Sequence, residues 1–521
     1  MNDKIITVAK KAARRMARAT GTPYQTCLDN VARSAGRSHW AAFLADPVDV
    51  SERPAEPADV PGIIAGHVPP NKALEKDEPD LATDPVRRYV VEIAEEPVDP
   101  AARIPLRTRI ARMLTRPERG IVKRAERHNV LRRVQRRDEG TYGMPFGRSV
   151  ENGYSLALVE TLPVLALSPP GTGKTASIVV PTIVSCDRHS MVVHDEMGLT
   201  EMTSGYRATL GPVTILDLGS DRSMGGLNPL SSSWIPLDVQ ARTSYVAALT
   251  RALSPDCRAV ADVMAMAIHD LFKADGGTTF LALDAVLRAA GDPVSIHAAM
   301  TISPFLDPAT RKCTETTSLR PRDLRGVLDE HGLRPATLYL VRHPAGNERH
   351  RLVAAVIQEA IWWWGLTVGP GELSPDGDRH GAFPVTVVLE DVHRLGHMPS
   401  FANAIEKGRG RKLAALVTAP SYRTMERVVG RNVDELEALF GVQIVLRQND
   451  GATIAHLERR LYGVTREDLR GSRNRTHLVA LQYEAEPVRV HTPFFFLSKD
   501  MLDKVYNPRT GKGPRPLTMS R

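Results

Sequence analysis

The sequence predicts an α/β protein built around a phosphate-binding loop, with an inserted all-helical lobe. Three observations predict this fold class. An apolar strand, a glycine-containing loop and a helix follow one another between Pro163 and Thr182. Beyond Val150, apolar runs typical of buried strands alternate with helical patterns, as in proteins with a parallel sheet. From Val239 to Thr301 the chain is rich in Ala, Leu and Met, without strand alternation.

The central segment, PVLALSPPGTGKTASIVVPT, has the order of a phosphate-binding loop. We predict a strand over residues 164–167, a loop whose glycines turn backbone N–H groups toward an anion, and a helix from about residue 174. In the G-x-x-x-x-G-K-[ST] pattern the lysine reaches the β- and γ-phosphates and the hydroxyl residue binds Mg²⁺. The residues predicted to bind ATP are Gly171, Thr172, Gly173, Lys174 and Thr175, with Thr175 also predicted as a metal ligand.

One part of this loop departs from the pattern. Ser168 stands where the first glycine is usual, and Pro169 and Pro170 follow it. Prolines have no N–H group, so the phosphate cradle must depend on the amides from Gly171 onward. A simple glycine turn between a strand and a helix is the alternative interpretation.

Composition limits the class of protein. The chain has 521 residues, 42% of them hydrophobic, and a formal net charge of +8, which fits a globular protein of two or three domains. The four cysteines show no C-x-x-C spacing, so neither a zinc site nor a disulfide framework is indicated. No window approaches an apolar membrane span, and residues 352–368, with three consecutive tryptophans, fit a core helix better than an interfacial belt. We therefore expect a cytoplasmic protein.

The first 148 residues divide into three segments. Residues 1–46 have the pattern of short helices and are predicted to form a small interaction module, with protein favoured over nucleic acid as its partner. Residues 47–100 are rich in proline and acids and are predicted to be a disordered linker. Residues 101–148 carry fourteen Arg or Lys against four Asp or Glu and are predicted to be a basic helical segment. Its part from Arg103 to Arg148 could contact anionic lipid at the inner face of the plasma membrane, or DNA, or be a solvated helix face.

The remaining chain is predicted to hold the nucleotide-binding domain, at residues 149–238 and 302–500. Strands are expected at 191–195, 213–218, 336–343, 385–391, 412–419 and 442–448, and a hairpin at 476–496. The all-α lobe is expected at 239–301 and a loose basic tail at 501–521.

Several predicted strands end in acids, and the carboxyl ends of parallel strands form the ligand side of such sheets. Asp195 and Asp217 could equally be turn or helix-capping residues. Glu390 and Asp391 follow a buried-type strand in the form of a Walker B segment, in which one acid holds Mg²⁺ and its neighbour orients the attacking water. We predict Glu390 as the metal-side acid and Asp391 as the base.

Several segments in this order resemble the coupling-protein ATPases of type IV secretion and conjugation systems. They are the phosphate loop, VVHDEMGLTEMTSGYR, LNPL at 227–230, LRPATLYLVRH and LEDVHRLGHMPSFANAIEKGRG. The resemblance covers roughly Gly147 to Phe496, with the helical lobe in the expected place. It implies a RecA-like P-loop NTPase core, ATP and Mg²⁺ as cofactors, and assembly into a homo-hexamer. It also implies partners: relaxase-bound single-stranded DNA or protein effectors, and components of the secretion channel.

The resemblance also assigns a role to Arg409, which falls where the family supplies an arginine to the neighbouring subunit's nucleotide. Three features depart from the family. Glu390-Asp391 inverts the usual Asp-Glu order, Pro420 replaces a glutamine that senses the γ-phosphate, and the usual pair of N-terminal transmembrane helices is not recognisable. These departures favour nucleotide binding over fast hydrolysis.

Two alternatives remain beside a motor that brings DNA or protein to a secretion channel. One is an ATP-dependent receptor or adaptor with vestigial hydrolysis, which the loss of the glutamine favours. The other is a DNA translocase unrelated to secretion. The sequence does not distinguish DNA from protein as the substrate.

Overall fold

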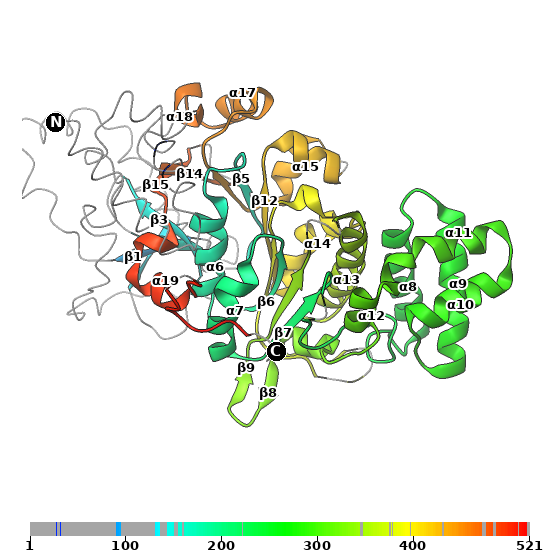
Figure 1. The fold of residues 1–521 in the computed structure, drawn as a ribbon. Helices are drawn as coiled ribbons and strands as arrows, with labels where there is room; N and C mark the ends of the chain where they lie inside the picture. Colours follow the sequence, from blue (N-terminus) through cyan, green and yellow to red (C-terminus); the bar gives the residue numbers. More distant parts are fainter. Residues whose placement is uncertain are drawn as a thin grey trace, which may run out of the picture. The chain divides into compact units, whose positions relative to one another are not determined.

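The computed structural model describes residues 143–517 apart from short gaps, and a few short pieces before them (Figure 1). The gaps are residues 151–154, 159–160, 221, 344–346, 375–376, 378, 396, 430–431, 471–475, 483–485 and 509; the earlier pieces are residues 28, 32, 90–94 and 131–135. The chain falls into two compact units. Unit 1 comprises Met1–Glu160, Ala166–Asp187 and Val442–Arg515, and unit 2 comprises Thr161–Leu165, Arg188–Gly441 and Pro516–Arg521.

Unit 2 is built on parallel strands in the order β12-β11-β6-β10-β7. Their bounds are β6 Ser190–Asp195, β7 Val213–Asp217, β10 Thr337–Val341, β11 Val385–Leu389 and β12 Leu413–Ala419. Strands β6, β11 and β12 are buried along their whole length, as expected for runs of Val, Leu and Ala covered on both faces. The strands predicted at these positions, and the α/β class, are confirmed.

Helices connect these strands, because parallel neighbours need a crossover. They include α7 (Leu199–Leu210), α12 (Pro308–Thr314), α13 (Asn347–Thr367), α14 (Phe401–Gly408), α15 (Tyr422–Val429) and α16 (Val433–Leu439), and a small antiparallel hairpin joins β8 (Val327–Asp329) to β9 (Gly332–Arg334). Trp362 and Trp364 on α13 are buried, so the core-helix interpretation of this segment is confirmed. Among the described residues, no helix combines the length and apolar character required to cross a bilayer.

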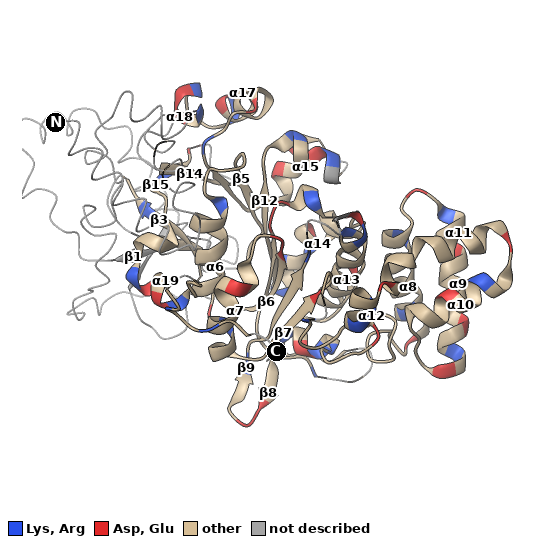
Figure 2. Cartoon of the chain, in the orientation of Figure 1, with Lys and Arg blue, Asp and Glu red and all other residues tan. Residues whose placement is uncertain are grey.

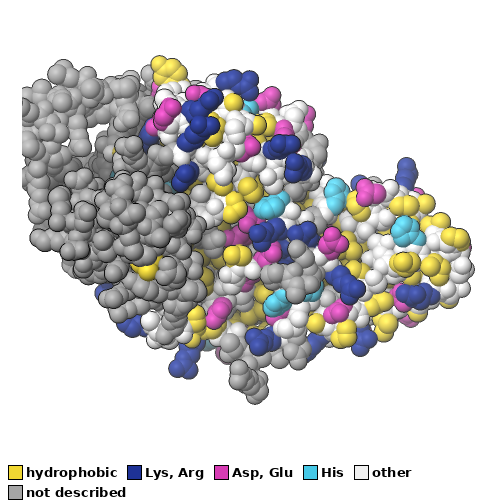
Figure 3. All heavy atoms as spheres, turned by 45° about the horizontal axis from the view of Figure 1, so that its top comes forward, with side chains coloured by type: hydrophobic (Ala, Val, Ile, Leu, Met, Phe, Trp, Pro, Cys, Tyr) yellow, Lys and Arg dark blue, Asp and Glu magenta, His cyan; other side chains and the backbone are white. Residues whose placement is uncertain are grey.

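The helical lobe of unit 2 contains α8 (Val239–Leu253), α9 (Arg258–Asp275), α10 (Phe280–Ala290) and α11 (Pro293–Thr301). The side chains of Asp238, Thr279 and Asp292 accept hydrogen bonds from the first turns of α8, α10 and α11, which explains where these helices begin. Both signs of charge are interspersed over the lobe helices (Figure 2). Single apolar side chains such as Met266 and Met300 are exposed among them, and Figure 3 shows this mixed surface.

Unit 1 contains antiparallel strands in the order β4-β3-β15-β14-β13. Their bounds are β3 Met144–Ser149, β4 Ser155–Leu158, β13 Val442–Val445, β14 Thr476–Leu481 and β15 Val488–His491. Its helices are a π-helical turn η2 (Thr175–Val179) continued by α6 (Val180–Ser185), then α17 (Gly451–Arg460), α18 (Arg466–Arg470), the 3₁₀ turn η8 (Phe495–Leu497) and α19 (Lys499–Lys504). The hairpin predicted at 476–496 is confirmed.

The N-terminal predictions need correction where the structure describes them. Strand β1 (Val90–Ala94) lies inside the segment predicted to be disordered, and β2 (Leu131–Gln135) and β3 lie inside the segment predicted to be helical. β1 pairs in parallel with β2 and antiparallel with β4. Pairing between distant segments decides strand formation, which local helical spacing does not report. The module predicted at 1–46 lies outside the described residues except Leu28 and Ala32, which are buried and helical.

The predicted tail also contains structure. Helix α19 crosses the predicted boundary at residue 501, and Asn507 pairs with Lys512 in an isolated antiparallel bridge. Asn507 is buried. The prediction of a loose tail is therefore wrong for these residues.

Candidate functional site

The predicted phosphate loop leaves the buried strand β5 (Val164–Leu167) and enters the helix that begins with η2. Gly171 and Gly173 have φ angles of +79° and +91°, a region that residues with a side chain rarely adopt. The two glycines therefore let the loop turn sharply between the strand and the helix. This is the backbone form that the sequence pattern predicts.

Side chains of the loop bind its own backbone. The Lys174 ammonium is buried and donates to the carbonyl oxygen of Ser168 at 2.6 Å. The Thr172 hydroxyl donates to the carbonyl oxygen of Pro169 at 2.8 Å and contacts the Ser168 hydroxyl. Ser168, at the position of the usual first glycine, thus helps to close the loop. A phosphate oxygen is a stronger acceptor for an ammonium than a neutral carbonyl, so Lys174 fits an anion at this loop.

The helix after the loop begins with a wider turn than predicted. The Val180 N–H donates to the Thr175 carbonyl five residues back, as in a π-helix. In a regular α-helix the ring of Pro181 would clash with the carbonyl of Ser177, to which proline cannot donate. We attribute the π-helical turn to this proline. Such turns are frequent at functional sites.

The C-terminal part of unit 1 packs against the same loop and helix. A side chain at Gly173 would meet Cε1 of Phe494 at 2.7 Å, so this ring lies directly against the loop. The ring of Phe494 stacks on that of Phe496, with centroids 5.1 Å apart. The Lys504 ammonium donates to the carbonyl of Val184 in α6 at 3.3 Å. The phosphate loop is therefore supported by residues more than 300 positions away in the chain.

In unit 2, the predicted Walker B acids follow β11. Glu390 is 5% exposed, and Asp391 has a φ angle of +48°. The Asp391 N–H donates to the Thr418 hydroxyl of the neighbouring strand β12 at 2.8 Å, which fixes this turn. Pro420 follows directly after β12. The structure thus places the two acids at the carboxyl end of a central parallel strand, as predicted.

A charged network that the sequence analysis did not identify adjoins the acid pair. Arg394 lies 3.2 Å from a carboxylate oxygen of Glu196 and 3.9 Å from one of Asp391. Arg342 lies 3.3 Å from the other oxygen of Glu196 and donates to the Arg394 carbonyl at 2.7 Å. Burial lowers the pKa of Arg342, against the attraction of Glu196. Arg394, held by Glu196, therefore lies beside Asp391, the predicted base. The sequence signal that could have revealed this network is the acidic pair Asp195-Glu196 at the end of β6.

Asp195 and Asp217 have structural roles. One carboxylate oxygen of Asp195 accepts from the N–H groups of residues 197–199 and the other from Thr200, which caps the start of α7. Asp217 accepts from the His343 ring at 2.8 Å and from the Ser220 hydroxyl at 2.6 Å. The capping interpretation is therefore the correct one for Asp195, and the carboxylate of Asp217, at the end of β7, binds the turn that follows this strand.

The remaining predicted residue, Arg409, directly follows α14 and opens the 3₁₀ turn η7 (Arg409–Arg411). It is partly exposed. The predicted site residues thus fall into two groups: Gly171 to Thr175 in one loop of unit 1, and Glu390, Asp391 and Arg409 in unit 2. Among the described residues, no group of three or more His, Cys, Asp or Glu could hold a metal ion. An Mg²⁺ ion bound with a single carboxylate would need further ligands of other kinds, such as a hydroxyl and phosphate oxygens.

Comparison with known proteins shows what the chain is similar to. Residues 125–289, which include the phosphate loop and most of the lobe, match a family model described as type IV secretory system conjugative DNA transfer. The resemblance to the conjugative coupling proteins is confirmed. No curated protein sequence matches the chain.

Solved structures of coupling proteins share this fold. The unbound bacterial conjugative coupling protein TrwBdeltaN70 superposes with a TM-score of 0.50 at 14% identity, over 68% of this chain and 88% of that chain. The plasmid coupling protein TrwB in complex with ADP and Mg²⁺ has a TM-score of 0.50 at 13% identity, over 64% and 85% of the two chains. VirB4 of Thermoanaerobacter pseudethanolicus is 12% identical, with a TM-score of 0.48 over 67% and 96%. The two TrwB structures therefore show that the chain has the P-loop NTPase fold of the coupling proteins.

Proposed function

We propose that this chain is an ATP-binding motor of the coupling-protein type, which brings DNA or protein substrates to a type IV secretion or conjugation channel. The observation that carries the proposal is the phosphate loop, in which Gly171 and Gly173 have positive φ angles and the buried ammonium of Lys174 lies in the loop itself, donating to the Ser168 carbonyl. The coupling-protein fold and the matched family model support it independently.

In this proposal each residue has a defined task. In unit 1, Lys174 binds the β- and γ-phosphates and Thr175 offers its hydroxyl to Mg²⁺. In unit 2, Glu390 offers a carboxylate to the metal and Asp391 orients the attacking water. Bound Mg²⁺ neutralises charge on the phosphates, and Arg409 stabilises the transition-state charge on the nucleotide of a neighbouring subunit in a hexameric ring.

The partners proposed for the ring are relaxase-bound single-stranded DNA or effector proteins, and channel components. The basic stretch from Arg103 to Arg148 is proposed to hold the protein peripherally on anionic membrane or on DNA through its charge. Most of that stretch lies outside the described residues.

One observation favours slow hydrolysis, and with it the second candidate function, an ATP-dependent receptor. Arg394 lies 3.9 Å from the carboxylate of Asp391, so the proposed base is partly engaged by a cation. Pro420 also offers no side-chain amide to the γ-phosphate. In this second function, ATP binding orders the ring and turnover contributes little.

The test is ATP binding and turnover by the full chain and its Lys174→Ala variant. Titration calorimetry should show ATP binding by the parent and none by the variant, because the cradle lacks amides at the two prolines and depends on the ammonium. Lys512→Ala removes an exposed lysine of the same unit and should bind like the parent. Equal ATP affinity for Lys174→Ala and the parent would contradict the loop assignment. Turnover with and without single-stranded DNA then separates a motor from a receptor.

A further inference from the structure

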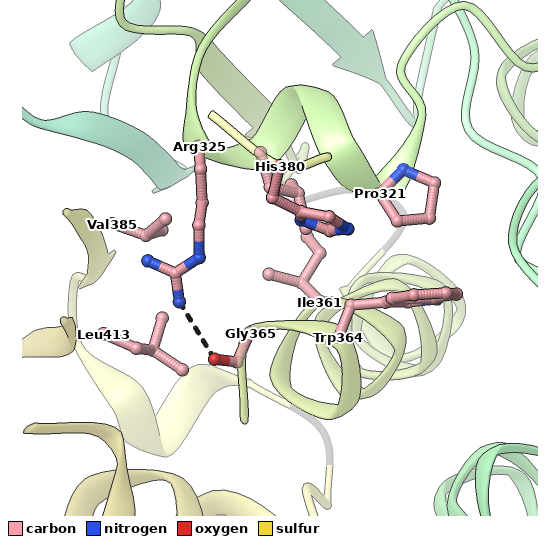
Figure 4. A pocket seen from close by; sticks show the side chains of 9 residues that line it. Pro321, Arg325, Ile361, Trp364, Gly365, His380, Val385 and Leu413 are labelled. Atoms are coloured by element: carbon pink, nitrogen blue, oxygen red, sulfur yellow. Dashed lines mark hydrogen bonds between the residues drawn. The ribbon is translucent and has the colours of Figure 1, made fainter. Parts of the chain in front are cut away.

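Arg325 is a fully buried arginine in unit 2, at the end of the 3₁₀ turn η4 (Pro321–Arg325). Figure 4 shows its guanidinium beside Gly365, with the rings of His380 and Trp364 at one side of a small cavity. The cavity holds about 10 Å³, which is room for about one water molecule. Desolvation lowers the Arg325 pKa to about 10, with Glu372 opposing the shift, so the group stays charged at neutral pH.

The guanidinium is surrounded by backbone carbonyls. The shortest bonds go to Arg411 at 2.6 Å, Gly365 at 3.0 Å and Val368 at 3.1 Å. Longer ones reach the carbonyls of Lys412 at 3.4 Å and Phe383 at 3.5 Å. Two of these carbonyls belong to the last turn of α13 and the residue after it, and two to the turn that carries Arg409 and leads into β12.

The turn needs such support, because its backbone is not regular. Lys412 has a φ angle of +52°, which a non-glycine residue adopts at a cost of about 1 kcal/mol or more. The Arg411 side chain is itself bound, 2.6 Å from the carboxylate of Glu372. Arg325 therefore fixes the backbone of the turn, and Glu372 holds one of its two arginines.

A buried residue on α13 itself holds the other end of the same segment. Glu359 is fully buried, and its Oε1 accepts from the Ser400 N–H at 3.0 Å, at the start of α14. Its Oε2 has no hydrogen-bond partner among the described atoms. Both ends of the segment from Ser400 to Lys412 are thus connected to α13. Glu359 of α13 holds one end directly, and Arg325 bridges the other end to the carbonyls of Gly365 and Val368.

We propose that Arg325 and Glu359 are positioning residues that fix Arg409 in the orientation needed for its action on a neighbouring subunit's nucleotide. This inference rests on the proposed function, which gives Arg409 that action. A reacting group displaced by about 1 Å can cost on the order of a hundredfold in rate, so loosening either attachment should slow turnover. ATP binding at Lys174 should be unchanged.

The same attachment connects Arg409 to the lobe. On α13, Trp363 donates from its indole nitrogen to the Ser244 hydroxyl of α8 at 3.1 Å, and its ring meets that of Tyr245 edge-on with centroids 5.2 Å apart. Helix α13 therefore contacts the lobe helix α8 and also holds the segment that carries Arg409. A shift of α13 caused at the lobe would be passed to Arg409 through Arg325 and Glu359.

The test is a double-mutant cycle in the full chain. Arg325→Lys keeps the charge but cannot reach the carbonyls that the planar guanidinium bridges. We expect it to lower kcat for ATP about tenfold or more, with KM and ATP affinity unchanged. It should not lower further the residual turnover of Arg409→Ala, measured in single-turnover assays with enzyme in excess. Arg258→Lys, at a highly exposed arginine of α9, is the matched control and should be neutral.

The outcomes separate the two hypotheses. Arg325→Lys with parental kcat, or with the same loss in the Arg409→Ala background, would overturn the positioning role. Full turnover by Arg409→Ala would instead show that the proposed function fails at that arginine. Should Arg325→Lys not fold, Glu359→Leu serves as the second variant and should have a lower kcat than the parent. Glu359→Gln keeps an acceptor for the Ser400 N–H, so its kcat should be close to that of the parent. Equal loss in both Glu359 variants would also count against the proposal.

Discussion

At the scale of single residues, backbone conformation explains one departure from the family order. Asp391 has a positive φ, a region that Asp and Asn tolerate better than longer side chains. Its N–H is held by Thr418, so the turn cannot relax without losing that bond. The positive φ angle therefore gives a structural reason for an aspartate at position 391. The shorter side chain also has a consequence for catalysis.

The consequence can be tested by restoring the usual order. Asp391 is one methylene shorter than the glutamate expected to orient water, so the swap Glu390→Asp with Asp391→Glu should raise ATP turnover. Adding Pro420→Gln should raise it further, with little change in ATP affinity. Because Glu at a positive φ is less favourable, the swap should also cost about 1 kcal/mol of stability, seen as a lower Tm.

Steady-state ATPase assays and thermal denaturation measure the two effects. A parent protein that hydrolyses ATP rapidly, and that the swap inactivates, would show that the site is adapted to the inverted order. The receptor interpretation would then be wrong.

The buried Glu359 gives a pH dependence of stability. Burial raises the pKa of this carboxyl from 4.5 to about 7, although Ser400 and the charge of Arg251 oppose the shift. The folded chain therefore binds more protons than the unfolded chain between these values. The stability contribution is fully present below pH 4.5 and is lost as the pH rises toward 7. Glu359→Gln should remove this loss, which is at most about 3 kcal/mol.

Thermal unfolding at several pH values between 4.5 and 8 should show the Tm of Glu359→Gln rising relative to the parent as the pH increases. Glu406→Gln, at an exposed acid on α14, is the control and should follow the parent. Parallel Tm profiles for Glu359→Gln and the parent would contradict the raised pKa.

At the scale of elements, the phosphate loop depends on both its own backbone and a distant aromatic residue. Gly173 combines a φ of +91° with a close approach of the Phe494 ring. The position next to Lys174 therefore requires glycine for two reasons, the positive φ angle of the loop and the ring of Phe494 that packs against it.

The variants Gly173→Ala and Phe494→Leu separate the effect of the positive φ angle from that of the contact with the Phe494 ring. Gly173→Ala should weaken ATP binding at least tenfold, because the added Cβ meets the Phe494 ring and the backbone is strained. Combining it with Phe494→Leu relieves the steric contact but not the strain, so affinity should recover only in part. Calorimetry with ATP measures this, and Phe494→Leu alone is the control. Complete recovery would show that the φ angle imposes no cost at this position.

At the scale of the whole molecule, the proposed ring requires that Arg409 act between subunits. Arg409→Ala should bind ATP but lose turnover, and Lys174→Ala should lose both. Mixing the two variants should restore some activity, because certain interfaces then pair an intact Lys174 with an intact Arg409. Turnover across mixing ratios is the measurement. Mixed rings that form without any recovery would argue against action in trans.

Local sequence determined much of this protein. The strand-loop-helix order around Lys174, the buried strands of unit 2 and the helical lobe from Val239 to Thr301 all follow from short-range patterns of apolar residues, glycines and caps. Such patterns fix hydrogen bonds between near neighbours and the face that each element buries. They also placed Glu390 and Asp391 at a strand end and Arg409 after a helix.

Only the tertiary structure decided the roles of residues whose partners are distant in the sequence, because short-range patterns contain no information about those partners. The capping role of Asp195 and the turn role of Asp217 depend on where their carboxylates find donors. The ion pair that holds Arg394 on Glu196 joins residues about two hundred positions apart, and the backbone carbonyls bound by Arg325 lie tens of positions from it in the chain. The strands at residues 90–94 and 131–135 formed against the local pattern because their partners lie elsewhere in the chain. Burial and long-range pairing set these roles, and both exist only once the chain has folded.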